Sequence, residues 1–249
     1  MQFSYGSSVV RVNMPDRASL LAEISRRLRS RQGFALATIN LDHLVKLRQD
    51  PAFRQAYAGQ DLVVADGNPI VWLSRLARRP VDLVTGSDLV IPLAQLAADE
   101  DVGLALVGTT DAALKAAAAD IARRVPGCRI DALIAPPMGF DPDSDMARDL
   151  LLRVRDSGAG LCFLALGAPR QERLAARGRS LVPEIGFASV GAGLDFLAGN
   201  QARAPRWVRR IAMEWAWRMA SAPRRLVPRY ARCAAILPSE AAAAWKQRR

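Results

Sequence analysis

The chain has 249 residues, of which 51% are hydrophobic, and its formal net charge is +11. This length allows one large α/β domain with an appendage, and the sequence contains no run of about 18 uncharged apolar residues that would predict a membrane-spanning helix. The first residues lack the pattern of a secretory signal, and the three cysteines have neither disulfide nor zinc spacing, so we expect a reduced, cytoplasmic protein.

Short apolar segments alternate with longer segments of helical periodicity between residues 17 and 190. The segments predicted as buried strands are 34–39, 61–65, 102–107, 128–134, 160–166 and 187–190. The segments predicted as helices are 17–29, 41–57 with an interruption at Pro51, 69–78, 89–98, 111–124, 146–156 and 171–181. This alternation predicts an α/β domain over residues 1–200, with a Rossmann-like, mostly parallel sheet and helices on both faces.

Residues 201–249 differ in charge from the rest of the chain. They hold 12 of the 35 basic residues and two of the 24 acidic residues, so their net charge is +10, whereas residues 1–200 carry +1. Trp207, Ile211 and Trp215 recur at four-residue spacing, with Trp217 close by, which is the pattern of an amphipathic helix that binds at an interface. We therefore predict a basic, helical appendage over residues 201–249, broken into short helices by its prolines.

Two other interpretations of the appendage fit the same pattern. A helix docked on the body of the protein would bury the tryptophans, and basic aromatic segments also bind single-stranded nucleic acid. Both interpretations remain open from the residues alone.

Asp66 directly follows the predicted strand 61–65 and precedes Gly67, Asn68 and Pro69. In parallel sheets the functional site lies at the carboxyl ends of the strands, and a carboxylate beside a glycine suits a general base there. Asp66 would equally suit the N-cap of a helix that begins at Pro69.

Thr38 and Asn40 lie at the end of the preceding strand. A hydroxyl and an amide at this position could bind a phosphate or a sugar hydroxyl, although Asn40 or Asp42 could also serve only as a helix cap. His43, the single histidine, is more readily explained as a structural residue than as a proton shuttle.

Gly167 to Glu172 (GAPRQE) link a predicted strand to a predicted helix. The free N–H groups of such a helix start could cradle a diphosphate, with Arg170 adding charge and Gln171 acting as a neutral donor. The alternative is an ordinary strand–helix turn with a proline at the helix start. Gly191-Ala192-Gly193 lacks the third glycine of a dinucleotide fingerprint and is a weak signal for NAD.

The segment DPDSD (residues 141–145) resembles a DxD metal site. Acidic residues are also favourable at a helix start, and we prefer this interpretation, so we expect no metal or other cofactor. With a single histidine, no Ser-His-Asp site can be assembled with an independent general base.

Several of these stretches resemble the WecG/TagA/CpsF family of bacterial glycosyltransferases, over roughly residues 8–230. The matching segments are TINLDHL (38–44), LVVADGNPIVW (62–72), VTGSDL (84–89), LVGTT (106–110), LGAPRQE (166–172), VGAGLDFLAG (190–199), RAPRWVRRIAMEWAWR (203–218) and PRRLVPRY (223–230). Residues 231–249 match nothing to which we assign a role.

The resemblance implies an inverting, metal-independent transferase. It would move a sugar from a UDP donor to a polyprenyl-diphosphate-linked saccharide, in cell-envelope or exopolysaccharide synthesis, while associated with the inner face of the bacterial cytoplasmic membrane. Asp66 would be the catalytic base, and Thr38, Asn40 and Gln171 would line the donor pocket. The other candidate substrate-binding residues are Gly67, Asn68, Gly108, Gly167, Arg170, Gly191, Asp195, Arg218, Arg225 and Arg229.

The resemblance leaves the donor sugar open between an N-acetylmannosamine type, which we favour, and glucose. The expected partners are the UDP-sugar, the lipid-linked acceptor, the membrane surface bound through residues 203–230, and a second copy of the chain, but not nucleic acid. Two different classes of protein remain as alternatives: a nucleotide-dependent oxidoreductase, and a non-catalytic module that binds anionic lipid or nucleic acid through the appendage.

Overall fold

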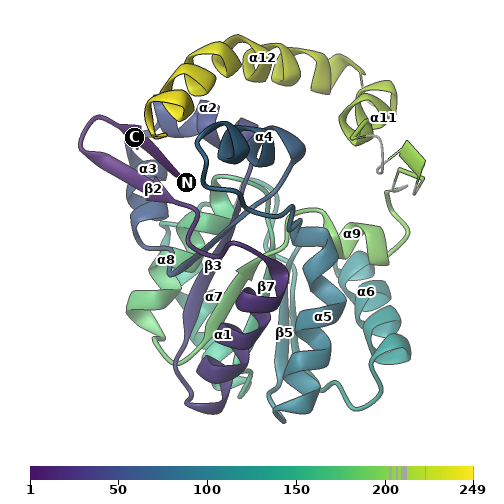
Figure 1. Ribbon diagram of the computed structural model, residues 1–249. Helices are drawn as coiled ribbons and strands as arrows, with labels where there is room; N and C mark the ends of the chain where they lie inside the picture. Colours follow the sequence, from purple (N-terminus) through teal and green to yellow (C-terminus); the bar gives the residue numbers. More distant parts are fainter. Residues whose placement is uncertain (202–203, 206, 209–211, 222, 249) are drawn as a thin grey trace.

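The computed structural model describes residues 1–201, 204–205, 207–208, 212–221 and 223–248. Its centre is a six-stranded sheet with the strand order β4-β3-β8-β7-β5-β6, in which every pair of neighbours is parallel (Figure 1). The strands of this sheet are β3 (Phe34–Ile39), β4 (Leu62–Ala65), β5 (Leu104–Gly108), β6 (Ile130–Ile134), β7 (Leu161–Ala165) and β8 (Gly186–Ser189). The predicted α/β fold class is confirmed, because all six strands predicted from the sequence are present.

Helices cover both faces of the sheet. Helices α1, α5 and α6 pack on one face, and α2, α3, α7 and α8 pack on the other. The bounds are α1 (Arg17–Arg29), α2 (Leu41–Gln49), α3 (Pro51–Ala58), α4 (Asn68–Leu76), α5 (Gly86–Asp99), α6 (Asp111–Arg124), α7 (Asp145–Asp156), α8 (Arg170–Leu181), α9 (Gly193–Leu197), α11 (Glu214–Ser221) and α12 (Pro223–Lys246). Because helices cover both faces of the sheet, β4 and β5 consist of apolar residues and glycine, and in β3 only Thr38 is polar.

A two-stranded antiparallel hairpin at the start of the chain was not predicted. It consists of β1 (Gln2–Tyr5) and β2 (Ser8–Arg11), joined at Gly6 and Ser7, and Gly6 has a φ of +62°. Phe3 and Val10 face each other across the hairpin and are buried against the body. A glycine-containing two-residue turn between two short runs of aromatic and β-branched residues is the sequence signal for this element.

Helix α12 corrects the prediction that prolines break the appendage into short helices. The helix is continuous over 24 residues although Pro228 and Pro238 lie inside it, and Figure 1 shows it as an arc across the top of the molecule. Each proline removes one backbone hydrogen bond and bends a helix. The packing of α12 against α2 and α4 holds the helix together through these interruptions.

The tryptophan-rich segment before α12 is also not one helix. Trp207 and Val208 are helical, but Ala212 adopts a φ of +59°, and α11 begins only at Glu214. The expected four-residue stripe of Trp207, Ile211 and Trp215 is therefore interrupted, and Ile211 itself lies outside the described residues. Trp207, Trp215 and Trp217 are 65%, 44% and 40% exposed, which contradicts the alternative that docking buries them.

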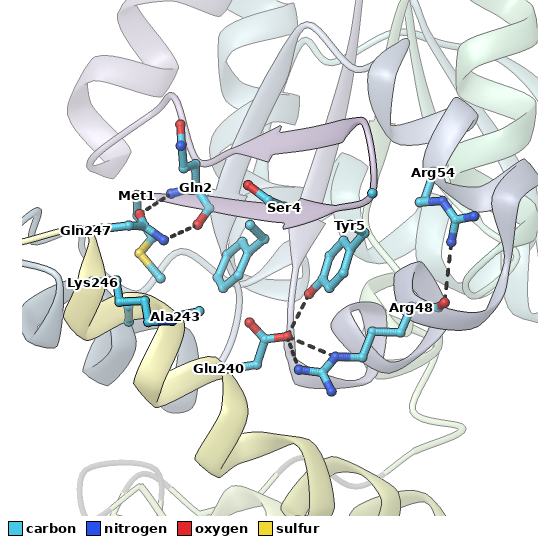
Figure 2. Close-up of a pocket in the computed structure, with 13 residues that line it drawn as sticks. Met1, Gln2, Ser4, Tyr5, Arg48, Arg54, Glu240, Ala243, Lys246 and Gln247 are labelled. Atoms are coloured by element: carbon cyan, nitrogen blue, oxygen red, sulfur yellow. Dashed lines mark hydrogen bonds and ion pairs between the residues drawn. The ribbon is translucent and has the colours of Figure 1, made fainter.

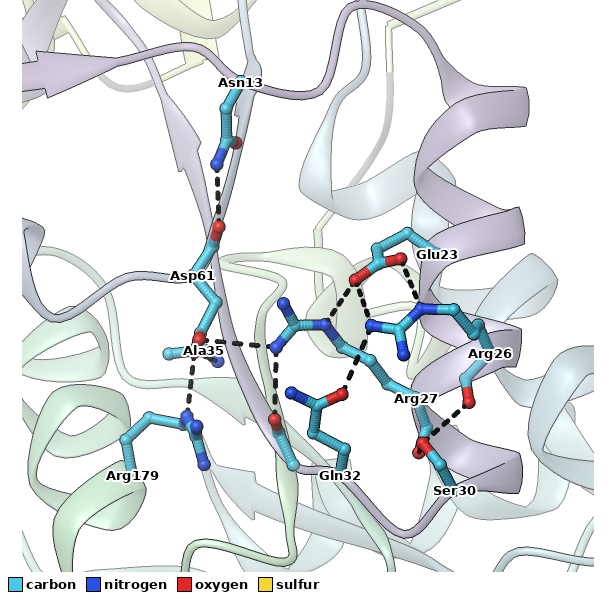
Figure 3. A network of polar contacts seen from close by, with 10 residues as sticks. Asn13, Glu23, Arg26, Arg27, Ser30, Gln32, Ala35, Asp61 and Arg179 are labelled. Atoms are coloured by element: carbon cyan, nitrogen blue, oxygen red, sulfur yellow. Dashed lines mark hydrogen bonds and ion pairs between the residues drawn. The ribbon is translucent and has the colours of Figure 1, made fainter.

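A polar network joins four elements at the amino ends of β3 and β4, opposite the edge where the candidate residues lie (Figure 3). The Asp61 carboxylate accepts hydrogen bonds from the Ala35 N–H (2.9 Å) and from Arg179 Nε of α8 (2.8 Å), and it lies 3.3 Å from the Arg27 guanidinium of α1. These contacts hold the elements together at the amino edge of the sheet. The candidate site residues lie at the opposite, carboxyl edge.

The end of α12 is attached to the hairpin and to α2 (Figure 2). Glu240 of α12 accepts hydrogen bonds from the Tyr5 hydroxyl at 2.9 Å and from the Arg48 guanidinium at 2.7 Å. Gln247 exchanges two hydrogen bonds with the backbone of Gln2, at 3.2 and 2.7 Å. A cavity of about 740 Å³ lies between these attachments.

Candidate active site

Asp66 lies at the carboxyl end of β4, beside β3. Its N–H donates to the Ile39 carbonyl at 2.7 Å, which continues the parallel ladder one residue beyond the strand. The N-cap residue of α4 is Gly67, with a φ of +104°, and not Asp66. The N-cap position is therefore one residue later than the sequence suggested, and the Asp66 side chain is half-buried.

Thr38 and Asn40 lie on the neighbouring strand end. Thr38 is opposite Val64, and because alternate residues of a strand share a face, the same face continues to Asp66. Thr38 is 4% exposed. Asn40 is the N-cap of α2, where its side-chain oxygen accepts a hydrogen bond from the His43 N–H at 3.1 Å. The capping alternative for Asn40 is thus confirmed, and its Cβ would lie 4.0 Å from a Cβ added to Gly67, so the two residues are neighbours at the carboxyl edge.

The glycines at the strand ends serve two different purposes. A Cβ added to Gly167 or Gly191 would meet no atom within 4 Å, so both positions leave open space at the carboxyl edge. Gly108 is buried, and a Cβ there would lie 2.4 Å from the Ala165 carbonyl oxygen. Gly108 is therefore required for the close approach of β5 and β7, and not for open space.

Asp195 is connected to the end of β5. Its carboxylate accepts a hydrogen bond of 2.6 Å from the Thr109 hydroxyl, and Gln201 lies 3.4 Å from its second oxygen. Thr109 has a φ of +42°, a strained conformation for a β-branched residue. This contact joins α9 to the carboxyl edge of the sheet.

The GAPRQE segment forms the start of α8. Pro169 is the N-cap residue, and Arg170 is exposed at the first position of the helix. Gln171 is 3% exposed, and its Nε2 donates to Glu172 Oε1 at 2.8 Å. The side-chain amide of Gln171, which we expected to act as a neutral donor, is therefore bonded inside the protein.

A buried polar cluster lies between α2, α3 and α8. His43 Nδ1 is 2.6 Å from the Tyr57 hydroxyl, and His43 Nε2 is 4.0 Å from Glu172 Oε1. Burial lowers the pKa of His43 to about 3, which keeps the imidazole neutral, and burial raises the pKa of Glu172 to about 7. His43 has the structural surroundings that we preferred for it.

Arg229 brings the appendage to the start of α2. Its Nε lies 3.1 Å from Asp42 Oδ1, and Lys46 binds the other oxygen of the same carboxylate. Burial raises the pKa of Asp42, but the hydrogen bond from Lys46 and the charge of Arg229 outweigh this effect and lower it. The side chains of Arg218 and Arg225 lie outside the part of the chain that the structure describes.

The acidic segment 141–145 starts α7, as preferred from the sequence. Ser144 is the N-cap residue, Asp145 lies in the first turn, and Asp143 forms an ion pair with Arg173 of α8. Within the described residues, no group of three or more His, Cys, Asp or Glu side chains is arranged to hold a metal ion.

Comparison with known families agrees with this arrangement of residues. The sequence model of the glycosyl transferase WecG/TagA/CpsF family matches residues 7–249. The chain belongs to this family. It is therefore a glycosyltransferase, with a nucleotide-sugar donor and an acceptor, in the synthesis of cell-envelope polysaccharide. Family membership decides against the oxidoreductase and the non-catalytic module, and the match includes residues 231–249, which the resemblance did not reach.

In the described part of this glycosyltransferase, no helix is long and apolar enough to cross a membrane.

Sequence reasoning missed Glu172 and Tyr57. The buried positions of α8 include 171, 172, 174, 175 and 178, so Gln171 and Glu172 continue the apolar face of that helix towards its start. A charged residue on the buried face of a predicted helix is the signal that could have identified Glu172.

Proposed function

We propose that this glycosyltransferase moves an N-acetylmannosamine-type sugar from a UDP donor to a polyprenyl-diphosphate-linked saccharide, with inversion and without a metal. The observation that carries the proposal is the placement of Asp66. Asp66 directly follows the edge strand β4, which pairs in parallel with β3, and it precedes Gly67, the N-cap residue of α4. This is the position where open α/β sheets bind nucleotides and substrates.

The reaction needs one base. Asp66 would take the proton from the acceptor hydroxyl, whose oxygen then attacks the anomeric carbon from the side opposite to UDP. The bond between the anomeric carbon and the diphosphate oxygen breaks, and UDP leaves with the electron pair. General base catalysis of this kind contributes about 10²- to 10⁴-fold to the rate.

Positive charge would stabilise the leaving UDP in place of a metal. Arg170 is exposed at the start of α8, where the helix dipole also favours an anion. The other candidates are Arg218, Arg225 and Arg229 of the appendage. Arg229 is paired with Asp42, so a contact with a diphosphate would compete with that carboxylate. The acidic segment 141–145 is occupied by helix capping and an ion pair, which supports chemistry that does not use it as a metal site.

The appendage would bind the inner face of the cytoplasmic membrane, where the lipid-linked acceptor lies. Two features support this location: residues 201–249 carry a net charge of +10, and Trp207, Trp215 and Trp217 are exposed. Basic residues close to an anionic leaflet contribute about 1 kcal/mol each, and tryptophan favours the membrane interface.

The proposal is tested by measuring UDP release in EDTA, with a panel of UDP-sugars and with polyprenyl-diphosphate N-acetylglucosamine or glucose as acceptor. We expect turnover with one donor–acceptor pair and a loss of about 10²- to 10⁴-fold in kcat for Asp66→Asn. The matched control is Asp82→Asn, which makes the same change at an exposed position.

Asp66→Asn should keep its thermal stability and its affinity for UDP, because only the proton acceptor is lost. Unchanged turnover in Asp66→Asn would contradict the role of Asp66, turnover abolished by EDTA would contradict metal independence, and release from UDP-glucose alone would correct the donor.

A further inference from the structure

Glu172 is an unusual residue for the interior of a protein. Its side chain is completely buried, one oxygen accepts the hydrogen bond from Gln171 Nε2, and the other oxygen has no hydrogen-bond partner. Buried carboxylates normally pair with a cation. Among the described residues, the nearest ion-pair partner of Glu172 is His43, whose Nε2 lies 4.0 Å away.

His43 Nε2 lies 4.0 Å from Oε1 of Glu172, the same oxygen that accepts the Gln171 hydrogen bond, and Tyr57 contacts His43. The Tyr57 phenol is neutral, because burial raises its pKa, and its hydroxyl lies 2.6 Å from His43 Nδ1. In the tautomer in which Nδ1 accepts the Tyr57 proton, the imidazole would carry its own proton on Nε2, the nitrogen that lies 4.0 Å from Glu172 Oε1. Edge-on contacts with the Phe53 and Tyr57 rings fix the plane of the imidazole.

The result is a buried polar cluster in which Tyr57 contacts His43, Gln171 is bonded to Glu172, and His43 and Glu172 lie 4.0 Å apart. Apolar side chains of the same volume would fill this space without the free-energy cost of burying polar atoms. The cluster ends at Gln171, the residue after the exposed Arg170 at the start of α8. Gln171 itself is 3% exposed, so the cluster lies just beneath the exposed start of α8.

Glu172 controls how the amide of Gln171 is oriented. An ionised carboxylate can only accept hydrogen bonds, so it holds Nε2 inward and leaves Oε1 as the remaining polar atom of the amide. This Oε1 has no partner in the structure. A protonated carboxyl can instead donate to Oε1, which would reverse the amide and release Nε2.

We propose that Glu172 is a positioning residue of the transferase, which orients the Gln171 amide for the donor site while His43 and Tyr57 hold Glu172 in place. This inference rests on the proposed function and on the donor-pocket role that the family resemblance implies for Gln171. Because Gln171 is 3% exposed and its Nε2 is bonded to Glu172, its amide would have to turn to meet the donor. Glu172 does not itself touch the substrate, and it acts through its charge state.

Other charged groups lie around the cluster of Tyr57, His43 and Glu172. Asp42 and Lys46 of α2 form an ion pair, Arg229 of α12 binds the same Asp42, and Asp66 lies near Tyr57. His43 stays neutral above a pH of about 3, because burial lowers its pKa. Burial raises the pKa of Glu172 to about 7, so Glu172 is the member of the Tyr57–His43–Glu172 cluster that changes charge near neutral pH.

The test compares kcat and KM of the wild type, Glu172→Gln and Glu172→Met between pH 5.5 and 8.5, by UDP release. Glu172→Gln keeps the shape and a hydrogen-bond acceptor for Gln171 but cannot ionise, so the part of the wild-type pH profile with a midpoint near 7 should disappear. Glu172→Met removes the acceptor, and we expect kcat to fall about 10- to 100-fold through misplacement of the amide. Glu184→Gln, at an exposed position, is the matched control and should follow the wild type.

A second measurement needs no substrate. The ¹⁵N resonance of the Gln171 side-chain amide, assigned from its loss in Gln171→Met, should shift with pH in the wild type, with a midpoint near 7. In Glu172→Gln the shift should be absent. An amide that does not titrate in the wild type would overturn the proposed orientation.

A pH profile of kcat that is the same in the wild type and in Glu172→Gln would overturn the role in catalysis, whatever the amide shows. Absence of turnover in the wild type with every donor would instead count against the proposed function, and the amide measurement would then decide the inference. A role in folding alone would lower the stability of Glu172→Met but would leave the pH profile of Glu172→Gln unchanged.

Discussion

Gly108 shows how a single residue sets the geometry of the carboxyl edge. It has a φ of +131°, and an added Cβ would lie 2.4 Å from the Ala165 carbonyl oxygen of the neighbouring strand. Gly108→Ala therefore combines a strained backbone with a displacement of β5 from β7, and we expect it to lower the free energy of unfolding by about 3 kcal/mol or more. The displacement should also reduce kcat, because Thr109 and its bond to Asp195 follow directly.

Gly127→Ala is the matched control for this prediction. Gly127 also has a positive φ, of +87°, but an added Cβ would meet no atom within 4 Å. This variant should lose only the backbone contribution, about 1 kcal/mol, and should keep its activity. Equal losses in denaturant titrations of the two variants would show that the close approach of the strands is not important.

Glu172 also predicts how stability depends on pH. Its pKa is raised in the folded protein from an ordinary value of 4.5 to about 7, so the folded state binds the proton more tightly than the unfolded state does. Protonated Glu172 therefore contributes to the free energy of unfolding. This contribution is fully present below about pH 4.5, falls as the pH rises to about 7, and is absent above that pH. The total change is roughly 3 kcal/mol.

The difference between Glu172→Gln and the wild type measures this contribution. Glu172→Gln cannot ionise, so only the wild type is destabilised by ionisation of residue 172 as the pH rises. The free energy of unfolding of the variant minus that of the wild type should therefore increase between pH 5 and pH 8. His43 has a lowered pKa and contributes stability that is lost as the pH falls from about 6.5 to about 3, but it does so in both proteins and cancels in the difference. Urea titrations of both proteins at pH 5 and pH 8 test this. If the difference in free energy of unfolding were the same at both pH values, the pKa of Glu172 would not be raised.

At the level of residues, the sequence predicts candidates better than it predicts their partners. Asp66 and Asn40 could be named because they follow apolar strands, and parallel strands end at one edge. The contacts of Thr109 with Asp195 and of Glu172 with His43 join residues 86 and 129 positions apart along the chain. Such pairs depend on how helices pack, which local sequence patterns do not specify.

At the level of elements, α12 depends on its attachment at Glu240. Glu240 is 4% exposed and accepts hydrogen bonds from Tyr5 and from Arg48. Glu240→Ala leaves the largely buried Tyr5 hydroxyl without its partner, and we expect a loss of about 1–3 kcal/mol in the docking of the helix. Hydrogen exchange should become faster in α12 and in the β1–β2 hairpin, while the central sheet stays protected.

Ser239→Ala is the neighbouring control, because Ser239 also contacts Arg48 but is exposed. It should change hydrogen exchange little. If exchange in α12 were equally slow in both variants, the hydrogen bonds of Glu240 would not be what holds the helix to the body.

The elements that were predicted correctly are those whose sequence pattern matches their surroundings. Strand β4 is apolar throughout and β3 is apolar except at Thr38, because both strands are covered on both faces. Asp50 and Pro51 mark the division between α2 and α3. Helix α12 was predicted to break because a proline is unfavourable inside an isolated helix. Tertiary packing against α2 and α4 outweighs that local preference, and the sequence does not show where this packing occurs.

At the level of the whole molecule, charge and catalytic machinery lie in different parts of the chain but meet in space. Residues 1–200 are nearly neutral and form the sheet, and residues 201–249 carry almost the whole net charge. Arg229 of the appendage reaches Asp42, two residues beyond Asn40 at the end of β3. An appendage bound to a membrane would therefore keep the carboxyl edge of the sheet next to the lipid surface.

This arrangement predicts that the affinity for an anionic membrane depends more on where a charge lies in the molecule than on the net charge of the whole protein. Arg224→Glu in α12 and Arg153→Glu in α7 both exchange an exposed arginine for a glutamate, so the two variants have the same net charge. Basic groups near an anionic leaflet contribute about 1 kcal/mol each, and a change of two charges should weaken binding about 10- to 30-fold in Arg224→Glu only. Arg153→Glu should bind vesicles as the wild type does.

Cosedimentation with phosphatidylglycerol vesicles measures this difference, with phosphatidylcholine vesicles and high salt as the conditions where binding should be weak. Tryptophan emission should shift to shorter wavelength on binding, since Trp207, Trp215 and Trp217 are exposed in the free protein. If both variants lost affinity equally, binding would depend on net charge alone, and the appendage would not be the surface that faces the membrane.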